Sequence, residues 1–594
     1  MRKKPIRLMC LAVMLLCVTV VIYRVNDNNK NSDIENPDIA DSGVSDEKNE
    51  ASIQCENDFL PVQLVIGNGS TSQNIRLFVS GGICYAFLPT YADMSELLCG
   101  YDEEILSVAL DGQLLARGQR LKAVETGQTY ELVLTDRAGN TVEYPFVFMQ
   151  SEHLPAVFID TVSGSLDYVN AVKGNEERGN FICITADGVV YSQSVISKIK
   201  GRGNTSWSSN GERNQYNIRL KEVAGVLGMK SARNWVLQSN KFDNSMMKNK
   251  LSYDLAKEIG VPYAIDSRFA DLYCNGEYMG AYLICEKVEI ADNRIDPHNK
   301  YLVERDDREL LPEESVETVY GPFAVHSPEN MTEGEHEYIA DYMRRTAESI
   351  AYMIDSDDYV NYIDSQSFAK LYAMNEISND PDANRLSSFF YKEDESDSKL
   401  IAGPVWDFDW AYGYDARSRE IRVSGFEEGW FEDLYKSRAF RDELRNVFEE
   451  IKAVYPRFNG EYFDNAKTQL MASYGMTMIR WQEAESVEAA SALLNTSVDN
   501  LQNNFSSRTE YLLEVFCGEQ EYHKVNFVYP GGKEFNHTYV EDGTTIPEEC
   551  VNHIYEVYGC VPCRLEDDTE IDWSTYVISE DIAIECRAPE LEEE

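Results

Sequence analysis

The sequence is poor in basic residues. Its 594 residues include 54 Lys and Arg against 102 Asp and Glu, which gives a formal net charge of −48 at pH 7. A chain with this excess of carboxylates lacks the basic surface on which nucleic-acid binding depends, so we exclude a nucleic-acid partner. A phosphate-bearing ligand remains compatible with the charge, but only if a divalent metal ion or a local group of cations binds it.

Histidine and paired cysteine motifs are also scarce. Among seven His residues, His326 and His336 lie in the body of the second half, and neither stands in a motif with a Ser or Cys nucleophile, which argues against a hydrolase. The calcium-loop spacing Asp-x-Asp-x-Asp-Gly does not occur.

Cys560 and Cys563 form a lone Cys-x-x-Cys pair. Because a zinc site needs a second such pair, disulfides or buried thiols are the expected states of the C-terminal cysteines Cys550, Cys560, Cys563 and Cys586.

Apolar residues, in contrast, are plentiful. Hydrophobic residues make up 43% of the chain and aromatic residues 11%, which excludes wholesale disorder. At about 150 residues per domain, the length suggests three or four domains. We therefore expect a multidomain protein with several separate cores.

The N-terminus carries an export signal. Four cations at positions 2, 3, 4 and 7 precede an apolar run over residues 8–23, as in a signal peptide or a membrane anchor. No small-x-small cleavage site follows, so we favour an anchor at 1–24, which attaches the chain to a membrane. The positive-inside rule then predicts an extracytoplasmic protein, membrane-anchored or secreted. Residues 25–56 are rich in Asn, Asp, Glu and Ser and predict a solvated tether.

Two stretches near the ends alternate apolar and polar residues. In the first, Val62, Leu64 and Ile66 alternate before a Gly-Asn-Gly turn, a pattern typical of half-buried antiparallel strands. We expect an N-terminal β-sandwich, Ig-like, over 57–152. The second stretch, 522–590, shows the same habit and predicts a small C-terminal β module that resembles β-rich repeats of bacterial surface proteins, with a plain spacer as the alternative.

The central region, residues 155–518, changes character along its length. Its first half mixes strands with one helix that Asp243 can cap and Gly260 ends. The dipeptide Asn275-Gly276 between two strand-like segments predicts a hairpin. After residue 330 the pattern becomes mainly helical. A β-rich half followed by a helical half is the two-lobed α+β plan of protein-kinase-like enzymes, which other enzymes share.

Two carboxylates stand two residues apart in an aromatic frame, in Trp406-Asp407-Phe408-Asp409-Trp410. In an extended segment, residues i and i+2 point to one face, which would aim both carboxylates at one hard divalent cation. Like charges among apolar rings also favour a counter-ion. The alternative is a loop whose acids face water beside stacked aromatic rings.

A polar loop precedes this segment. Asn379, Asp380, Asp382 and Asn384 follow an apolar helical stretch and precede the strand-like 389–391. A loop held between rigid elements suits a catalytic base, and phosphoryl transfer needs a carboxylate that orients the attacking hydroxyl. The alternative is a capped helix end whose acids and amides are solvated.

The sequence resembles the CotH kinase family, named for a spore-coat protein and similar in fold to atypical secreted protein kinases. Matching segments follow one another over some 300 residues and include Lys200-Gly-Arg-Gly-Asn-Thr-Ser-Trp207 and Asn275-Gly-Glu-Tyr-Met-Gly280. Further matches are residues 227–229, 234–237, 243–256 and 286–287 and the segments around Asp382 and Asp407. The β modules at either end lie outside the resemblance.

The resemblance implies roles for individual residues. Asp382 matches the catalytic-loop aspartate, the base for the acceptor hydroxyl. Asp407, with Asp409 beside it, matches the metal-binding aspartate, and Ser387 occupies the place of the metal-binding Asn of ordinary kinases. The cations that the site binds would be Mg²⁺ or Mn²⁺.

The nucleotide is expected at the turn that contains Lys200, Arg202, Gly203 and Asn204, whose backbone N–H groups could approach phosphates, although the turn could also be a simple β-turn. Relatives commonly carry a Lys pair where this chain has Arg213-Asn214. Arg213 is the candidate phosphate-binding residue there.

Arg219 or Lys248 are the possible substitutes for Arg213. Arg and Lys are not equivalent at such a position, because Lys carries a compact point charge and Arg a planar fork.

The expected function is therefore that of an extracytoplasmic, kinase-like phosphotransferase. It would transfer phosphate from ATP or a related nucleotide to a Ser or Thr hydroxyl of an extracytoplasmic protein. The alternative is a non-catalytic surface scaffold or adhesin built on the same fold, which the anchor and the flanking β modules favour.

Overall fold

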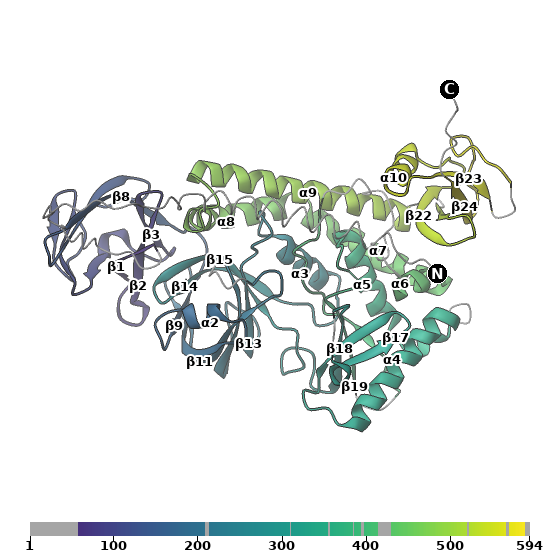
Figure 1. The fold of residues 1–594 in the computed structure, drawn as a ribbon, viewed down its shortest axis with the longest axis horizontal. Coiled ribbons are helices and arrows are strands. Elements are labelled where there is room, and N and C mark those ends of the chain that lie inside the picture. Colours follow the sequence, from purple (N-terminus) through teal and green to yellow (C-terminus); the bar gives the residue numbers. More distant parts are fainter. Residues whose placement is uncertain are drawn as a thin grey trace, which may run out of the picture. The chain divides into compact units, whose positions relative to one another are not determined.

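A computed structural model describes residues 58–207, 213–308, 311–353, 357–383, 385–393, 397–413, 429–518, 522–565 and 569–587 (Figure 1). The expected anchor at 1–24 and tether at 25–56 lie outside these residues. Within the described ranges, no helix combines the length and apolar character that crossing a membrane requires. The described strands form three open sheets and one closed barrel, so the protein is multidomain and rich in strands.

The region that alternates near the N-terminus is an eight-stranded sheet. Its order is β4-β1-β2-β3-β8-β7-β5-β6, and all neighbours are antiparallel except β3 and β8. Val62, Leu64 and Ile66 are buried, as their alternation predicts. Tyr278 and Met476 of the central region pack into the same core. The strands are β1 Phe59–Ile66, β2 Gln73–Ser80, β3 Ile83–Leu88, β4 Leu98–Tyr101, β5 Ile105–Leu110, β6 Gln113–Leu115, β7 Thr129–Asp136 and β8 Thr141–Gln150.

The first half of the central region is a closed barrel. Its strands follow the order β10-β11-β12-β13-β15-β14-β9, and the parallel pairing of β9 with β14 closes it. Apolar side chains from all seven strands share one core, which includes Trp235 and Ile284, so the interior is filled. The strands are β9 Ala156–Thr161, β10 Glu176–Ile184, β11 Val190–Arg202, β12 Gln215–Ala224, β13 Ala232–Gln238, β14 Ser267–Cys274 and β15 Glu277–Glu286, with the short helix α2 Asp167–Ala171 between β9 and β10.

The expected hairpin and helix of this half are both present. Asn275 and Gly276 join β14 to β15 with φ values of 52° and 82°, which a type I′ turn requires. Helix α3 spans Lys248–Glu258, later than Asp243 alone suggested. The Asp243 carboxylate nevertheless accepts the backbone N–H of Lys248 at 2.9 Å, so it caps the helix across a bend of the chain. Gly260, with φ 68°, follows the helix end.

The second half combines a five-stranded sheet with long helices. The sheet order is β17-β18-β16-β19-β20. Helix α5 is buried from residue 367 to residue 378, so it holds the loop that follows it firmly. The strands are β16 Asn299–Arg305, β17 Ser315–Thr318, β18 Gly321–Ser327, β19 Ser388–Glu393 and β20 Ile401–Ala402. The helices are α4 Glu333–Met353, α5 Ser365–Ser378, α6 Trp430–Lys436, α7 Arg438–Phe458, α8 Glu461–Arg480 and α9 Val487–Cys517.

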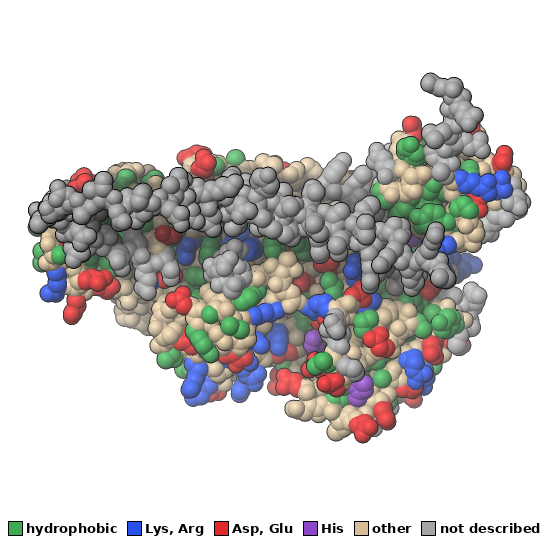
Figure 2. Space-filling view, in the orientation of Figure 1, with side chains coloured by type: hydrophobic (Ala, Val, Ile, Leu, Met, Phe, Trp, Pro, Cys, Tyr) green, Lys and Arg blue, Asp and Glu red, His purple; other side chains and the backbone are tan. Residues whose placement is uncertain are grey.

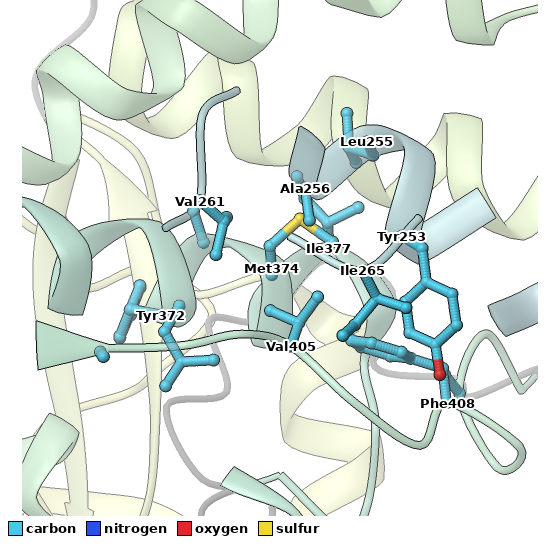
Figure 3. Packing of buried hydrophobic residues seen from close by; sticks show 14 of the residues in the cluster. Tyr253, Leu255, Ala256, Val261, Ile265, Tyr372, Met374, Ile377, Val405 and Phe408 are labelled. Carbon is cyan, nitrogen blue, oxygen red and sulfur yellow. The ribbon is translucent and has the colours of Figure 1, made fainter. Parts of the chain in front are cut away.

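One apolar core joins the two halves of the central region. Figure 3 shows Tyr253 of α3 beside Phe408, and Met374 and Ile377 of α5 beside Val405. The rings of Tyr253 and Phe408 meet edge to face with centroids 6.3 Å apart. The segment that carries Asp407 and Asp409 is therefore held by buried neighbours on both sides.

The C-terminal module is small and mixed. Its sheet order is β22-β21-β24-β23, and one helix accompanies it. Cys550, Cys560 and Cys586 are buried in the core of this module, and Cys560 and Cys586 are free thiols. Of the two expected cysteine states, buried thiols therefore apply here. The elements are β21 Tyr522–Val528, β22 Glu534–Glu541, α10 Glu548–Tyr558, β23 Val561–Leu565 and β24 Ile582–Arg587.

Candidate active site

The segment after β20 turns sharply at Asp407. This residue has φ 65°, so the segment is not extended, and the expectation that Asp407 and Asp409 share a face through period-two geometry does not apply. Val405 and Phe408 anchor the segment, each with 2% of its surface exposed. Trp406 stacks on Tyr253 with ring centroids 5.8 Å apart. The aromatic residues of this segment therefore serve as packing contacts, and Asp407 lies between buried residues of the same segment.

Asn249 of α3 fixes the second carboxylate. Its Oδ1 accepts the backbone N–H of Phe408 at 2.8 Å, and its Nδ2 donates to Asp409 Oδ1 at 2.6 Å. Asn249 is fully buried. The neighbouring Lys248 donates from Nζ to the backbone oxygen of Asp409 at 3.2 Å. The first turn of α3 thus orients Asp409 through two side chains.

The loop after α5 brings Asp382 and Ser387 to Asp407. Asn379 leaves α5 with φ 47°, and the buried Asp380 carboxylate accepts the backbone N–H of Asp382 at 3.1 Å. A hydrogen bond joins the Ser387 side chain to the Asp407 carboxylate. Asp382 is close enough for the Asp407 charge to raise its pKa. The structure therefore brings together Asp382, Ser387 and Asp407, which the sequence places in two separate segments.

Four carboxyl groups of the site have raised pKa values. Burial and then the Asp407 charge raise the pKa of Asp382 and of Asp409. Burial raises the pKa of Asp380 to about 8. The pKa of Asp407 is raised as well, by burial and by the nearby Glu304. Because like charges in a desolvated site repel one another, the site favours a positive partner.

These carboxylates interact in pairs. Within the described part of the chain, no group of three or more His, Cys, Asp or Glu side chains is arranged to hold a metal ion. Asp409 is turned toward Asn249. Ser387 and Asp407 are the two expected ligands that touch each other directly.

The turn after β11 has the shape that its two glycines permit. Gly203 has φ 90°, and a Cβ at this position would lie 2.0 Å from Ser206 Oγ. A Cβ at Gly201 would lie 2.5 Å from Trp207 Nε1. Both glycines are therefore required for the chain to fold back on itself here. Residues 208–212, which follow the turn, lie outside the described residues.

The cations of this turn extend toward the carboxylates. Arg202 donates to Gln215 Oε1 at 2.7 Å and lies over the Trp406 ring at 5.1 Å. Its charge, with that of Arg308, counteracts the raised pKa of Asp407. Asn204 accepts a hydrogen bond from Lys173 Nζ at 2.6 Å. The expected nucleotide-binding turn and the expected metal-binding aspartate thus adjoin each other.

A cluster of four cations emerges beside Asp407, and we call it the basic cluster: Lys173, Lys200, Arg202 and Arg308. Burial, and then the charges of Arg308, Arg202 and Lys200, lower the pKa of Lys173. Figure 2 likewise shows Lys and Arg side chains lying among the acidic ones on one face of the protein. Despite the net charge of −48, the protein therefore possesses the local group of cations that a phosphate ligand requires.

Arg213 lies apart from this cluster. It is 2% exposed, and its Nη2 donates to the backbone oxygens of Asn240 at 3.3 Å and Lys241 at 3.2 Å. Glu483 lies 3.6 Å from its Nη1. Of the two substitutes, Arg219 is exposed on β12, and Lys248 reaches the site.

Several site residues escaped the sequence analysis. Asn249 lies beside Lys248, which was singled out, and a buried polar residue in the first turn of a capped helix is the signal that could have identified Asn249. Lys173 and Arg308 carry no comparable local signal, because they come from the loop after α2 and from the loop after β16, which meet only in the fold.

Comparison with known proteins identifies the family. The profile of the family described as CotH kinase protein matches residues 199–512, more than half of the chain. The crystal structure of a Helicobacter pylori proinflammatory kinase, CtkA, is similar with 10% identity and a TM-score of 0.23, over 50% of this chain and 94% of that chain. No curated protein matches. The profile match covers the barrel from β11, the Asp382 loop and the Asp407 segment, and this kinase-like chain belongs to the CotH kinase family.

Proposed function

We propose that the protein is a metal-dependent phosphotransferase that moves a phosphoryl group from a nucleotide to a Ser or Thr hydroxyl of a protein. The observation that carries this proposal is the position of Asp407, which is hydrogen-bonded to Ser387 and lies within electrostatic reach of Asp382 and of Arg202 and Arg308 of the basic cluster. Phosphoryl transfer needs this combination of acidic ligands, cations and a base in one place. The barrel and the helical half would form the two lobes of the enzyme.

The donor set supports a hard divalent cation, Mg²⁺ or Mn²⁺. Asp407, Ser387 and Asp409 would supply carboxylate and hydroxyl oxygens, the ligands that such ions prefer. Burial raises the pKa of both aspartates, and a bound cation would favour their charged forms. When bound, the ion neutralises charge that develops on the transferred phosphate.

The basic cluster would hold the phosphates of ATP or a related nucleotide. The charges of Arg308, Arg202 and Lys200 lower the pKa of Lys173, and a polyphosphate would relieve this repulsion. The backbone N–H groups around Gly203 and Asn204 would add neutral donors.

Asp382 would act as the base. Its raised pKa makes it a better proton acceptor than an exposed aspartate, and proximity to the acceptor hydroxyl would let it orient the nucleophile before it takes the proton. The backbone N–H groups of Arg385 and Leu386 donate to the backbone oxygen of Asp382 at 3.1 and 3.0 Å, which would hold the carboxylate in position.

Phosphate transfer from labelled ATP to a basic-protein mixture and to the chain itself tests the proposal, with Mg²⁺ or Mn²⁺ present. Asp382→Asn and Asp407→Asn should each lower the rate by at least about 100-fold. Asp341→Asn, on the exposed face of α4 where Asp341 pairs with Arg345 at 2.8 Å, is the matched control and should leave the rate unchanged. Equal rates in all four proteins would refute the proposal.

A non-catalytic scaffold or adhesin is the second candidate. The burial of Arg213 against Glu483 removes one expected phosphate-binding cation and favours this alternative. Thermal unfolding with ATP and Mg²⁺ separates the two, because a ligand at 100 times its Kd stabilises the folded protein by about 2.7 kcal/mol. A stabilisation of this size that Asp407→Asn abolishes would exclude the pure scaffold.

The location would be extracytoplasmic, with the chain anchored in the membrane or secreted. The first 24 residues support this, through their cations and the apolar run that follows. Protease treatment of intact cells, compared with lysed cells, tests it: digestion in intact cells is the expected result, and protection until lysis would contradict it.

A further inference from the structure

A cavity of about 580 Å³ lies beside the segment that connects β15 to β16. Lys230 from the β12–β13 loop, Tyr263 and Ile265 from the α3–β14 loop, and residues 286–289 and 292–297 of the connecting segment line it. Its volume lies within the range of about 300–1,000 Å³ that small-molecule sites occupy. Nothing in the proposed phosphotransfer site uses this cavity.

Pro404, three residues before Asp407, is the lining residue nearest in sequence to the candidate active site. Glu286 lines the cavity, and Cys285 precedes it on the same strand, so their side chains point in opposite directions. On its own face, Cys285 packs in the same apolar core as Phe408 of the Asp407 segment. A ligand in the cavity would therefore be separate from a nucleotide at the basic cluster.

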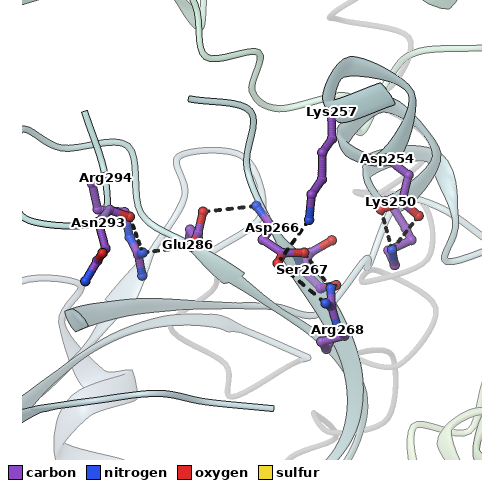
Figure 4. A network of polar contacts seen from close by, with 9 residues as sticks. All are labelled: Lys250, Asp254, Lys257, Asp266, Ser267, Arg268, Glu286, Asn293 and Arg294. Carbon is purple, nitrogen blue, oxygen red and sulfur yellow. Dashed lines mark hydrogen bonds and ion pairs between the residues drawn. The ribbon is translucent and has the colours of Figure 1, made fainter. Parts of the chain in front are cut away.

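Arg294 is the most enclosed charged side chain of the cavity lining. With 2% of the side chain exposed, Nη1 donates to Glu286 at 2.7 Å and to the backbone oxygen of Asn293 at 2.9 Å (Figure 4). The Nε and Nη2 groups have no hydrogen-bond partner among the described residues. Buried donors without partners are rare, so two on one guanidinium point to a missing acceptor.

The neighbours of Arg294 define which acceptor fits. The guanidinium lies over the Trp235 ring at 4.8 Å, which fixes its plane. The second oxygen of Glu286 accepts the backbone N–H of Asp266 at 3.1 Å. The unpartnered edge, Nε with Nη2, carries two parallel donors that match the two oxygens of a carboxylate or phosphate.

The lining holds four carboxyl groups (Glu286, Glu289, Asp292 and Asp296) and three cations (Lys230, Lys287 and Arg294), and Glu289 and Asp296 have partners of their own. Glu289 accepts a hydrogen bond from Asn234 at 2.6 Å and lies 3.9 Å from Lys287 Nζ. Asp296 is bound to His298 at 2.6 Å. Lys230 is exposed, and its positive charge reaches the Arg294–Glu286 pair, where it lowers the pKa of Glu286 against the effect of burial.

We propose that this cavity binds a small organic anion. Its carboxylate or phosphate would pair with Nε and Nη2 of Arg294, and its apolar part would lie against Tyr263 and Ile265. Because both donors are buried in the ligand-free protein, the side chains above them move when the anion enters, and the binding is an induced fit. The inference is independent of the proposed phosphotransfer.

Calorimetric titration of the full chain, without metal ions, tests this inference with two probes, benzoate and phenyl phosphate. One of them is expected to bind saturably with a Kd of about 1 mM or tighter. The neutral benzyl alcohol should not bind. The substitution Arg294→Lys keeps the positive charge beside Glu286 and removes the paired edge, so it should weaken binding at least about tenfold. Lys198→Ala, on the barrel surface beside Glu176, is the matched control.

Three results would overturn the inference: no saturable binding of either anion, equal affinity in Arg294→Lys, or loss of binding in Arg202→Ala, which would place the anion at the basic cluster. Should Arg294→Lys fail to fold, as circular dichroism would show, Lys230→Ala replaces it. Lys230 is exposed, so its truncation should not disturb the core. The expected result is a severalfold loss of affinity for the anion, and an unchanged affinity would contradict the inference.

Discussion

Asp271 offers a sharp test of how the buried polar groups of this protein behave. It lies on β14 with no exposed surface, where Tyr278 donates to its Oδ1 at 2.8 Å and Ser473 of α8 to its Oδ2 at 3.0 Å. Burial outweighs these hydrogen bonds and raises the pKa of Asp271 from 3.8 to about 6. We expect Asp271→Asn to abolish a pH dependence of folding stability that the wild type shows.

The direction and the size of this pH dependence of stability follow from proton linkage. Because the pKa of Asp271 is raised in the folded protein, its contribution to stability is complete below about pH 3.8 and is lost as the pH rises through about 6. A shift of about two units corresponds to about 3 kcal/mol at most. Asparagine cannot ionise, so the variant should not undergo this loss. Relative to the variant, the wild type should therefore lose up to about 3 kcal/mol between pH 4 and pH 6.5.

Urea unfolding, followed by tryptophan fluorescence in steps of pH, measures this difference. The stability of each protein is compared with that of Asp341→Asn, which alters an exposed carboxylate of α4 whose ion pairs lie at the surface. If the difference between wild type and Asp271→Asn were the same at pH 4 and pH 6.5, the buried carboxyl would not be linked to folding and the reasoning would be refuted.

Three further predictions concern the site and its support. Arg508→Met should lower the free energy of urea unfolding by about 3–5 kcal/mol, because Arg508 of α9 pairs at 2.5 Å with Glu376 of α5, whose side chain is fully enclosed. An unchanged unfolding midpoint would contradict this prediction. Asn249→Ala should lower Mn²⁺ affinity in calorimetry about 10- to 100-fold by releasing Asp409, with retained affinity arguing against Asp409 as a ligand. Gly203→Ala should lower the free energy of unfolding by about 1–3 kcal/mol and weaken ATP binding, because a residue with a Cβ is strained at φ 90°. An unchanged free energy of unfolding in urea would show that the turn relaxes.

Local sequence signals predicted the elements that depend on neighbouring residues. Asn275-Gly276 identified a hairpin because only a left-handed pair of residues joins these strands tightly. Gly260 marked the end of α3, and the polar loop after α5 was expected where it lies. The family resemblance is confirmed by the profile match. In each case the determining residues stand within a few positions of the feature that they determine.

The sequence was less informative where distant segments meet. Asp407 adopts φ 65° because Phe408 is anchored by Asn249, 159 positions away, and no local pattern conveys this. Arg213 is buried because Glu483 and the backbone after β13 surround it. The five-stranded sheet was largely missed for the same reason, since β16 pairs with β19 across more than 80 residues.

The parallel pairing of β9 with β14 has a consequence for how the chain acquires its structure. Val157 pairs with Leu272, so the barrel cannot close until synthesis has passed β14. Contacts between residues this far apart along the chain form slowly, and an unpaired strand offers its backbone to other chains in the meantime. A fragment that ends before residue 267 would thus leave β9 without a neighbour on one side and would be prone to aggregate. Useful truncations of this protein must retain both strands.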